Sequence, residues 1–508
     1  MSEKKKKAVR AKDYFINRKK SSPPPSAGKK KEIPRAVVNH SVVKAERTVR
    51  LNNGHYLATV VGYDDELKGI AEVGGVPCEV IGGIAGEREE IAVVRKEQGR
   101  PIACFVGSEK PSPFRRAPLC PHFGECGNCD LQHFVPEAQS ALKKNLVEKA
   151  LPEAKGLTEE VVCGKEYGYR NKVHLAFGEE HNRIYVGFFS ETDNRVTEVR
   201  RCPLHGKWFS DFADAVVRWA KAFNLHAYKP YSGKGLLRFA AARYRDGNLL
   251  VTIVATSGKI SGLERLYRSL LEKFRTVGLY VLENKGKSPD VMAGELRHVA
   301  GEKTLKGELL GVSYELSPRS FYQVNEEVAE RAYADILAEI SSAAEERVID
   351  CFSGIGITSV LFAKSGKAVT SIEIEKDAVR DAAKLIAVNG VKDKVRALCG
   401  DVFKLLPGIG KGKNSVFFVD PPRKGLGPEV CSLIAGFAPS RIVYLSCNPV
   451  TLGEDVRRLL RAGYALRCVR PYDFFPQTRH VEVLAVLTRK ASVPGGMPDK
   501  NNTNHGLA

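Results

Sequence analysis

Residues 347–358 read RVIDCFSGIGIT, and this stretch carries the clearest fold signal in the chain. A β-type run over residues 347–350 leads through Gly354 and Gly356 into a helix start. Glycines between a strand and a helix let the backbone approach a ligand closely. The third glycine of the dinucleotide fingerprint is missing, because residue 359 is Ser. A nucleoside-containing ligand therefore fits better than a phosphorylated dinucleotide, although such turns also occur without any ligand.

Strand and helix patterns alternate around this loop. The predicted helix covers residues 377–386, and further strand-like runs cover residues 368–373, 394–398, 416–420 and 442–446. This alternation predicts a doubly wound α/β domain with a mainly parallel sheet. Ligands of such domains bind beyond the carboxyl ends of the strands, where the sequence puts Asp350, Glu373, Asp420 and Cys447. Because Glu373 ends the strand after the glycine loop, we expect it to accept both ribose hydroxyls of S-adenosylmethionine.

Cys447 is the candidate nucleophile. It lies between the strand run 442–446 and a helix that Asn448 would cap, with Pro449 at its first position. A helix N-terminus lowers the pKa of a nearby thiol and favours the thiolate. A buried cysteine at a strand end without any reactivity is the alternative.

Two carboxylates complete the expected catalytic crevice. Glu482 interrupts the apolar final strand 481–487, and beside Cys447 it would act as a general base. Period-2 alternation also permits Glu482 to face solvent on an edge strand. Asp420 opens the proline-stiffened segment DPPRKG at 420–425 and is expected to accept N–H groups of a base or a methionyl amine. We expect His480 to serve a local structural role.

A second cluster of cysteines lies outside this domain. Cys120, Cys126 and Cys129 follow a C-x5-C-x2-C spacing, and they need a fourth ligand to bind a metal centre. Cys202 is the best candidate because it too lies in a Cys-Pro turn, and Cys163 is its competitor. Four thiolates suit either zinc or an iron-sulfur cluster, and the absence of paired x2 spacings favours iron-sulfur.

Short β-type runs separated by glycine turns dominate the N-terminal part. They cover residues 56–62, 69–73, 78–82, 89–94 and 102–106. Strands this short at such regular intervals predict a small β-barrel. A middle region over residues 151–318 mixes strand and helix character and carries no catalytic motif that we recognise.

The charge of the chain favours a polyanionic partner. The net charge is +20, of which residues 1–35 contribute +10 in a lysine-rich segment interrupted by prolines. We expect this tail to be disordered and the remaining positive charge to contact nucleic acid, although a merely solubilising tail is the alternative. No apolar run reaches the length of about 18 residues that a membrane span needs, and the basic N-terminus lacks the apolar core of a signal peptide. We therefore expect a cytoplasmic protein, without membrane contact and monomeric, whose twelve cysteines do not form a secreted disulfide framework.

These motifs together resemble the bacterial 23S rRNA (uracil-5-)-methyltransferase family, which makes 5-methyluridine with S-adenosylmethionine. The resemblance covers residues 45–490 and rests on FYQVN at 321–325, the glycine loop, DPPR at 420–423, SCNP at 446–449 and HVE at 480–482. It implies Cys447 as nucleophile, Glu482 as base, and a 4Fe-4S cluster. The ligands of that cluster would be Cys120, Cys126, Cys129 and Cys202. Contacts to S-adenosylmethionine or uracil would come from Gln323, Phe352, Gly354, Gly356, Glu373, Asp401 and Asp420.

The resemblance also implies a domain organisation. We expect a disordered basic tail (1–44), a TRAM-like RNA-binding barrel (45–108), an α+β central domain with the cysteine motif (109–318), a Rossmann-like class I methyltransferase domain (319–490) and a disordered tail (491–508). The expected substrate is RNA, 23S rRNA first. A tRNA uracil-5 methyltransferase is the nearest alternative, and a non-catalytic RNA-binding assembly factor is a second one.

Overall fold

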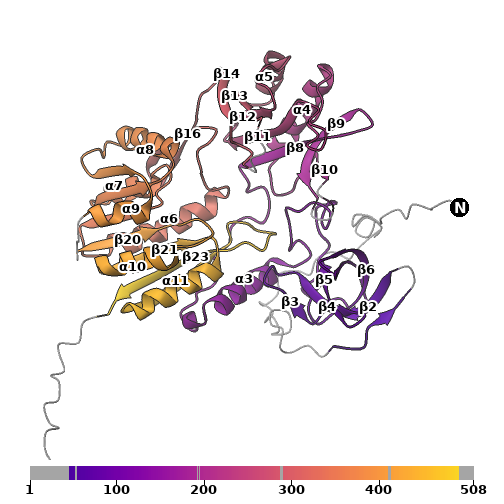
Figure 1. The fold of residues 1–508 in the computed structure, drawn as a ribbon, viewed down its shortest axis with the longest axis horizontal. Coiled ribbons are helices and arrows are strands. Elements are labelled where there is room, and N and C mark those ends of the chain that lie inside the picture. The colour runs from indigo at the N-terminus through magenta and orange to yellow at the C-terminus, as the bar shows by residue number, and fades with distance from the viewer. Residues whose placement is uncertain are drawn as a thin grey trace, which may run out of the picture.

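The computed structural model describes residues 45–51, 54–190, 193, 195–285, 290–409 and 414–490. The expected tails 1–44 and 491–508 lie outside these residues. Within the described part, three seven-stranded sheets follow one another along the chain (Figure 1). In Figure 1 the first sheet is indigo, the second is magenta, and the third runs from orange to yellow.

The third sheet carries the glycine loop and has the strand order β19-β18-β17-β20-β21-β23-β22. Its first five strands are parallel, whereas β23 runs antiparallel to both of its neighbours. The doubly wound, mainly parallel sheet predicted from the strand runs between residues 347 and 446 is thereby confirmed. The strands are β17 (Arg347–Cys351), β18 (Ala368–Glu373), β19 (Val395–Cys399), β20 (Ser415–Val419), β21 (Arg441–Ser446), β22 (Tyr464–Tyr472) and β23 (Glu482–Arg489).

Alternating side chains of these strands pack into two separate cores, one on each face of the third sheet. Val348 belongs to the core on one face and its neighbour Ile349 to the core on the other. A strand that is buried on both faces needs a continuous apolar run, which explains why the sequence of β17 shows no polar alternation. The covering helices are α6 (Glu326–Ser341), α7 (Ile357–Lys364) and α8 (Lys376–Val388) on the first face, and α9 (Val402–Leu405), η3 (Leu406–Ile409), α10 (Gly427–Phe437) and α11 (Pro449–Arg461) on the second.

The second sheet has the order β10-β9-β8-β11-β12-β13-β14 and forms its own hydrophobic core with α4 (Trp208–Ala222) and α5 (Leu263–Leu271). Most of its strand pairs are antiparallel, whereas β12 and β13 are parallel. Its strands are β8 (Lys172–Glu180), β9 (Arg183–Phe189), β10 (Val196–Glu198), β11 (Leu237–Arg245), β12 (Asn248–Ala255), β13 (Thr276–Glu283) and β14 (Glu295–Gly301). The hairpin that follows, β15 (Leu305–Leu309) and β16 (Val312–Leu316), packs into a core of the third sheet.

The first sheet has the order β1-β2-β6-β7-β5-β4-β3. β2 and β3 are separated only by Val60 and Val61, yet β2 pairs with β6 while β3 pairs with β4, so the sheet is strongly curled. The five strand runs predicted from the sequence are confirmed, with shifted ends. The strands are β1 (Val49–Arg50), β2 (His55–Thr59), β3 (Gly62–Tyr63), β4 (Gly69–Val73), β5 (Val76–Ile81), β6 (Arg88–Glu97) and β7 (Arg100–Ser108).

Helix α3 (Pro136–Ala150) connects the first sheet with the third, as Figure 1 shows. Its first half contributes Ala138 and Leu142 to the core of the first sheet. Its second half contributes Val147 to a core of the third sheet, which η2 (Pro152–Ala154) extends. Among the described residues, the helices are all too short or too polar to cross a membrane.

Candidate active site

The candidate residues of the third sheet lie at one edge, because the carboxyl ends of parallel strands meet there. Each strand of the parallel set ends in one of them. Gly354 and Gly356 follow β17, Glu373 is the last residue of β18, Asp401 follows β19, Asp420 follows β20 and Cys447 follows β21.

The glycine loop and Glu373 are joined by direct hydrogen bonds. The Gly354 N–H donates to Oε2 of Glu373 at 2.9 Å, and the Glu375 N–H donates to Oε1 at 2.8 Å. Gly356 has φ 83°, and a Cβ on it would lie 3.2 Å from Cβ of Ala382, so a larger residue would strain the turn. Phe352 also adopts a left-handed φ of 63° and is half-buried beside the loop.

Asp401 lies next to Glu373, whereas Gln323 contacts Asn171, just before the second sheet, and the hydroxyl of Tyr333. The Gly400 N–H donates to the carbonyl oxygen of Glu373 at 2.8 Å, which holds Asp401 next to the end of β18. Asp401 caps α9 by accepting from the Lys404 N–H at 3.3 Å. Gln323 is 5% exposed, and its carbonyl oxygen accepts from Nδ2 of Asn171 at 3.1 Å.

Cys447 and Glu482 are neighbours across two antiparallel strands. Ser446 of β21 is paired with Val483 of β23, so the next position in that register puts Cys447 beside Glu482. Glu482 is only 6% exposed, which excludes the solvent-facing position that alternation permits. The strand pairing thus brings the candidate nucleophile and the candidate base together.

The helix after Cys447 starts as predicted. Asn448 is its N-cap and accepts from the Val450 N–H at 3.1 Å, and Pro449 occupies the first turn. Nδ2 of Asn448 and Oγ1 of Thr451 both donate to the carbonyl oxygen of Arg423, at 3.0 and 3.1 Å. The start of α11 is therefore fixed to the loop that carries Asp420.

Burial controls the ionisation of these groups. It raises the pKa of Cys447 to about 11, helped by the charges of Glu482 and Asp420 and opposed by Arg423. The expectation that the helix start lowers the thiol pKa is therefore wrong, because desolvation and two carboxylates outweigh the helix N-terminus. Burial and the charge of Asp420 likewise raise the pKa of Glu482 to about 8. Burial and Asp350 raise the pKa of Asp420 to about 7.

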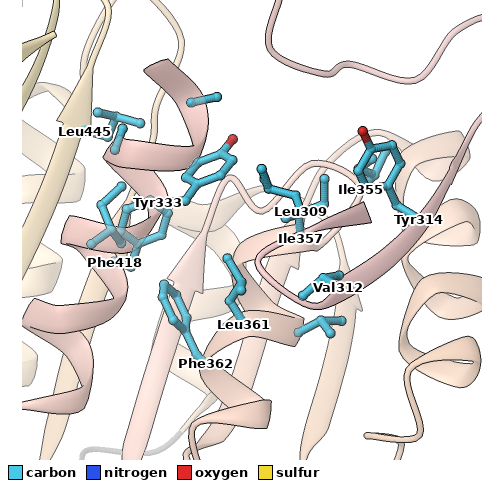
Figure 2. Packing of buried hydrophobic residues seen from close by; sticks show 14 of the residues in the cluster. Leu309, Val312, Tyr314, Tyr333, Ile355, Ile357, Leu361, Phe362, Phe418 and Leu445 are labelled. Carbon is cyan, nitrogen blue, oxygen red and sulfur yellow. The ribbon is translucent and has the colours of Figure 1, made fainter. Parts of the chain in front are cut away.

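Two residues without a predicted role belong to this group. Tyr333 is a buried residue of α6, and Gln323, Asp420 and Glu482 all influence the pKa of its hydroxyl, which burial raises above the usual range. Figure 2 shows its ring beside Phe418 and its hydroxyl pointing away from the packed side chains. Tyr333 follows the apolar spacing of the buried face of α6, so the sequence pattern indicates a core residue and gives no sign of a role in the site. Arg423 belongs to the DPPRKG motif, but the sequence predicted no role for its side chain. In the structure its charge opposes the rise in the pKa of both Cys447 and Glu482.

His480 contacts the loop that carries Asp420. Its Nδ1 lies 3.2 Å from Nη2 of Arg423, and burial together with the Arg423 charge lowers its pKa to about 4. The ring is therefore neutral at physiological pH.

The four cysteines of the predicted metal site lie within electrostatic reach of one another. The charges of Cys202 and Cys120 raise the pKa of Cys126, and those of Cys202 and Cys126 raise the pKa of Cys129, in each case after burial as the main cause. In the described ranges, however, no three His, Cys, Asp or Glu residues converge closely enough to hold a metal ion. Cys163 lies apart from this group, with its thiol 3.2 Å from Oγ of Ser140.

Comparisons with known proteins identify relatives of this chain. Residues 298–490 match the family model described as tRNA (Uracil-5-)-methyltransferase. An RNA methyltransferase of Caldanaerobacter subterraneus subsp. tengcongensis is 33% identical over 83% of this chain and 96% of its own length. An RNA methyltransferase of Clostridium tetani is 30% identical over 86% of this chain and 96% of its own length.

A solved structure has the same fold. The tRNA (uracil-54, C5)-methyltransferase of Pyrococcus abyssi, in complex with S-adenosyl-L-homocysteine, aligns with a TM-score of 0.70 over 85% of this chain and 98% of its own length. At 24% identity, this likeness concerns the fold alone. With the sequence relatives covering most of the chain, the protein belongs to the RNA (uracil-5-)-methyltransferase family.

Proposed function

We propose that this enzyme methylates C5 of a uracil in RNA, with S-adenosylmethionine as the methyl donor, Cys447 as the nucleophile and Glu482 as the base. The observation that carries the proposal is the β21–β23 register, which makes a thiol and a buried carboxyl neighbours at the ligand-binding edge of the sheet. A cysteine hydrolase would instead need a base, usually a histidine, that activates the thiol for acyl transfer. The nearby histidine, His480, has its Nδ1 at Arg423.

The chemistry of uracil explains these residue types. C5 is a poor nucleophile, so the Cys447 thiolate first adds to C6 and moves the π-electron pair into an enolate. Bound S-adenosylmethionine would supply the electrophilic methyl group: C5 takes the methyl as the S–CH3 bond breaks and S-adenosylhomocysteine leaves. Glu482 then takes the C5 proton, the C–H electrons restore the C5–C6 double bond, and the C6–S bond breaks to release the thiolate. Arg423 favours the thiolate form of Cys447, while Glu482 and Asp420 disfavour it.

The cofactor would bind along the ends of β17 to β20. Each carboxylate oxygen of Glu373 already accepts one backbone N–H, which leaves lone pairs for the two ribose hydroxyls. Phe352, Gly354 and Gly356 would line the nucleoside, and Asp401 would lie beside the base. Gln323 and Asp420 would contact the methionyl end or the target uracil.

The base assignment has a direct test. Glu482→Gln keeps the shape of the side chain but cannot take the C5 proton, so the methylated Cys447–RNA adduct should persist on a denaturing gel. Cys447→Ala is the matched control and should give no adduct. Adduct that is released from Glu482→Gln as rapidly as from the wild-type enzyme would remove Glu482 as the base.

We further propose 23S rRNA as the substrate and the curled first sheet as a TRAM-like RNA-binding barrel. The target base must leave its stack to reach Cys447, which favours single-stranded or loop RNA. The alternative, a tRNA substrate, has support from the description of the matching family model. Mapping 5-methyluridine in rRNA and tRNA from cells with and without the gene decides between them; loss confined to tRNA would overturn the rRNA assignment.

The division into domains at residues 108 and 318, and a 4Fe-4S cluster on Cys120, Cys126, Cys129 and Cys202, belong to the same proposal. What supports the cluster is the chemistry of the donor set, because the four thiols influence one another's pKa values. The cluster would link the loop 120–129 to the turn at Cys202. Protein purified without oxygen should be brown and contain iron and sulfide; a colourless zinc protein would contradict the assignment.

A further inference from the structure

The loop that leads into Glu482 is held from outside the third sheet. It spans residues 473–481 between β22 and β23. The N–H of Arg479 donates to Oδ2 of Asp130 at 3.1 Å, and Nη1 of Arg479 donates to Oδ1 at 2.7 Å. The backbone N–H groups of Asp130 and Leu131 both donate to the carbonyl oxygen of Gln477, each at 3.0 Å. Asp130 directly follows Cys129, so the loop 120–130 binds the chain at Arg479, three residues before Glu482.

Gln477 holds the same loop through several hydrogen bonds. It is 0% exposed and has a left-handed φ of 72°, which a non-glycine residue adopts only when its surroundings enforce it. Its Oε1 accepts from Arg116 at 3.1 Å and from Gln139 at 3.0 Å, and its Nε2 donates to Glu166 at 3.2 Å. Its own N–H donates to Oε1 of Gln139 at 3.1 Å. All four hydrogen-bonding groups of Gln477 are therefore engaged by residues from the first third of the chain.

We propose that Asp130 is a positioning residue for the general base, a role that rests on the proposed function of Glu482. The side of Glu482 that faces β21 is set by the pairing of Ser446 with Val483. On its other side Glu482 is paired with Tyr472 of β22. The residues that lead into it lie outside both strands, and the Asp130–Arg479 contact holds them. The two carboxylate oxygens of Asp130 accept hydrogen bonds from the backbone N–H and the guanidinium of Arg479. Two contacts to one residue fix the direction of its backbone as well as its position.

The consequence is specific to one step. Cys447 lies between β21 and α11, and the hydrogen bonds described for the start of α11 go to Arg423 rather than to Asp130. Attack at C6 and methyl transfer should therefore survive the loss of the Asp130–Arg479 contact, which we call the clamp. Proton removal from C5 should not, because a misplacement of about 1 Å can lower a rate by a factor on the order of 100. Weakening the clamp should therefore trap the same covalent intermediate as removal of the base.

The test compares Asp130→Ala, which removes both acceptors, with Arg479→Met, which removes the guanidinium contact and keeps the backbone one. We expect Asp130→Ala to lower kcat by about 10- to 100-fold, with KM values for RNA and cofactor changed by less than about threefold, and to accumulate the Cys447–RNA adduct. Arg479→Met should show a smaller effect in the same direction. Glu160→Ala is the matched control, because it removes an exposed carboxylate paired with Lys144 and should leave kcat and adduct level unchanged.

Thermal melting measured alongside separates positioning from folding. Lowered kcat with increased adduct in a folded Asp130→Ala or Arg479→Met protein supports the proposal. Wild-type kcat, or lowered kcat without adduct, overturns it. If Glu482→Gln accumulates adduct and neither clamp variant does, the positioning role alone is wrong; if Glu482→Gln accumulates none, the base assignment is wrong and the positioning role with it.

Discussion

Glu482 holds a proton in the folded protein that it would lose in the unfolded chain. Burial raises its pKa from 4.5 to about 8, and the charge of Asp420 adds to the rise. Between those two pH values the folded state binds more protons than the unfolded state, so stability falls as pH increases. The contribution of the protonated group is complete below about pH 4.5 and lost as pH rises through about 8. A buried base with this pKa is suited to catalysis near neutral pH, where it exchanges a proton readily.

Glu482→Gln should therefore stabilise the protein in a pH-dependent way. The amide is neutral at every pH, so the variant should match the wild type near pH 4 and exceed it by up to about 5 kcal/mol at pH 9. Melting temperatures measured at several pH values check this, with Glu160→Gln as an exposed control that should show no such trend. A constant difference between variant and wild type across the pH range would contradict the buried, raised-pKa state of Glu482.

At the scale of elements, the sequence predicted the strand ends of the third sheet well. Apolar runs and the glycine loop located β17, β18, β20 and β21, and with them the common edge where Glu373, Asp420 and Cys447 lie. These features depend on residues that are neighbours in the chain. The N-cap at Asn448 is likewise a local pattern, and the structure confirms it.

Features that depend on pairing between distant segments were not predictable in this way. Alternation left the direction of Glu482 open, and only the register with β21 decided it. The helix start after Cys447 predicted a lowered thiol pKa, whereas the structure gives a raised one. A helix N-terminus contributes only about 0.3–1 kcal/mol, and burial beside two carboxylates outweighs it. The sequence pattern did not predict the places of Tyr333 and Asp130. Each depends on side chains that are distant in the chain, such as Glu482 for Tyr333 and Arg479 for Asp130.

At the scale of the whole molecule, α3 makes the first and third sheets interdependent. Its residues enter the cores of both sheets. Midway along α3, Lys143 is 0% exposed, and its ammonium donates to Oδ1 of Asp473 at 2.6 Å and to the carbonyl oxygen of Phe475 at 3.1 Å. This buried pair attaches α3 to the same loop that Asp130 holds, so the loop before Glu482 depends on two separate segments of the N-terminal part.

Breaking this pair on one side should destabilise the whole molecule. Lys143→Met leaves the Asp473 carboxylate buried without its counter-ion, which should cost about 3–5 kcal/mol in urea unfolding. Lys149→Met, on the same helix, breaks an exposed pair with Asp65 and should cost less than about 1 kcal/mol. The double change Lys143→Met with Asp473→Leu removes both charges and should recover most of the loss. If the single change cost no more than Lys149→Met, the buried pair would not couple α3 to the catalytic loop.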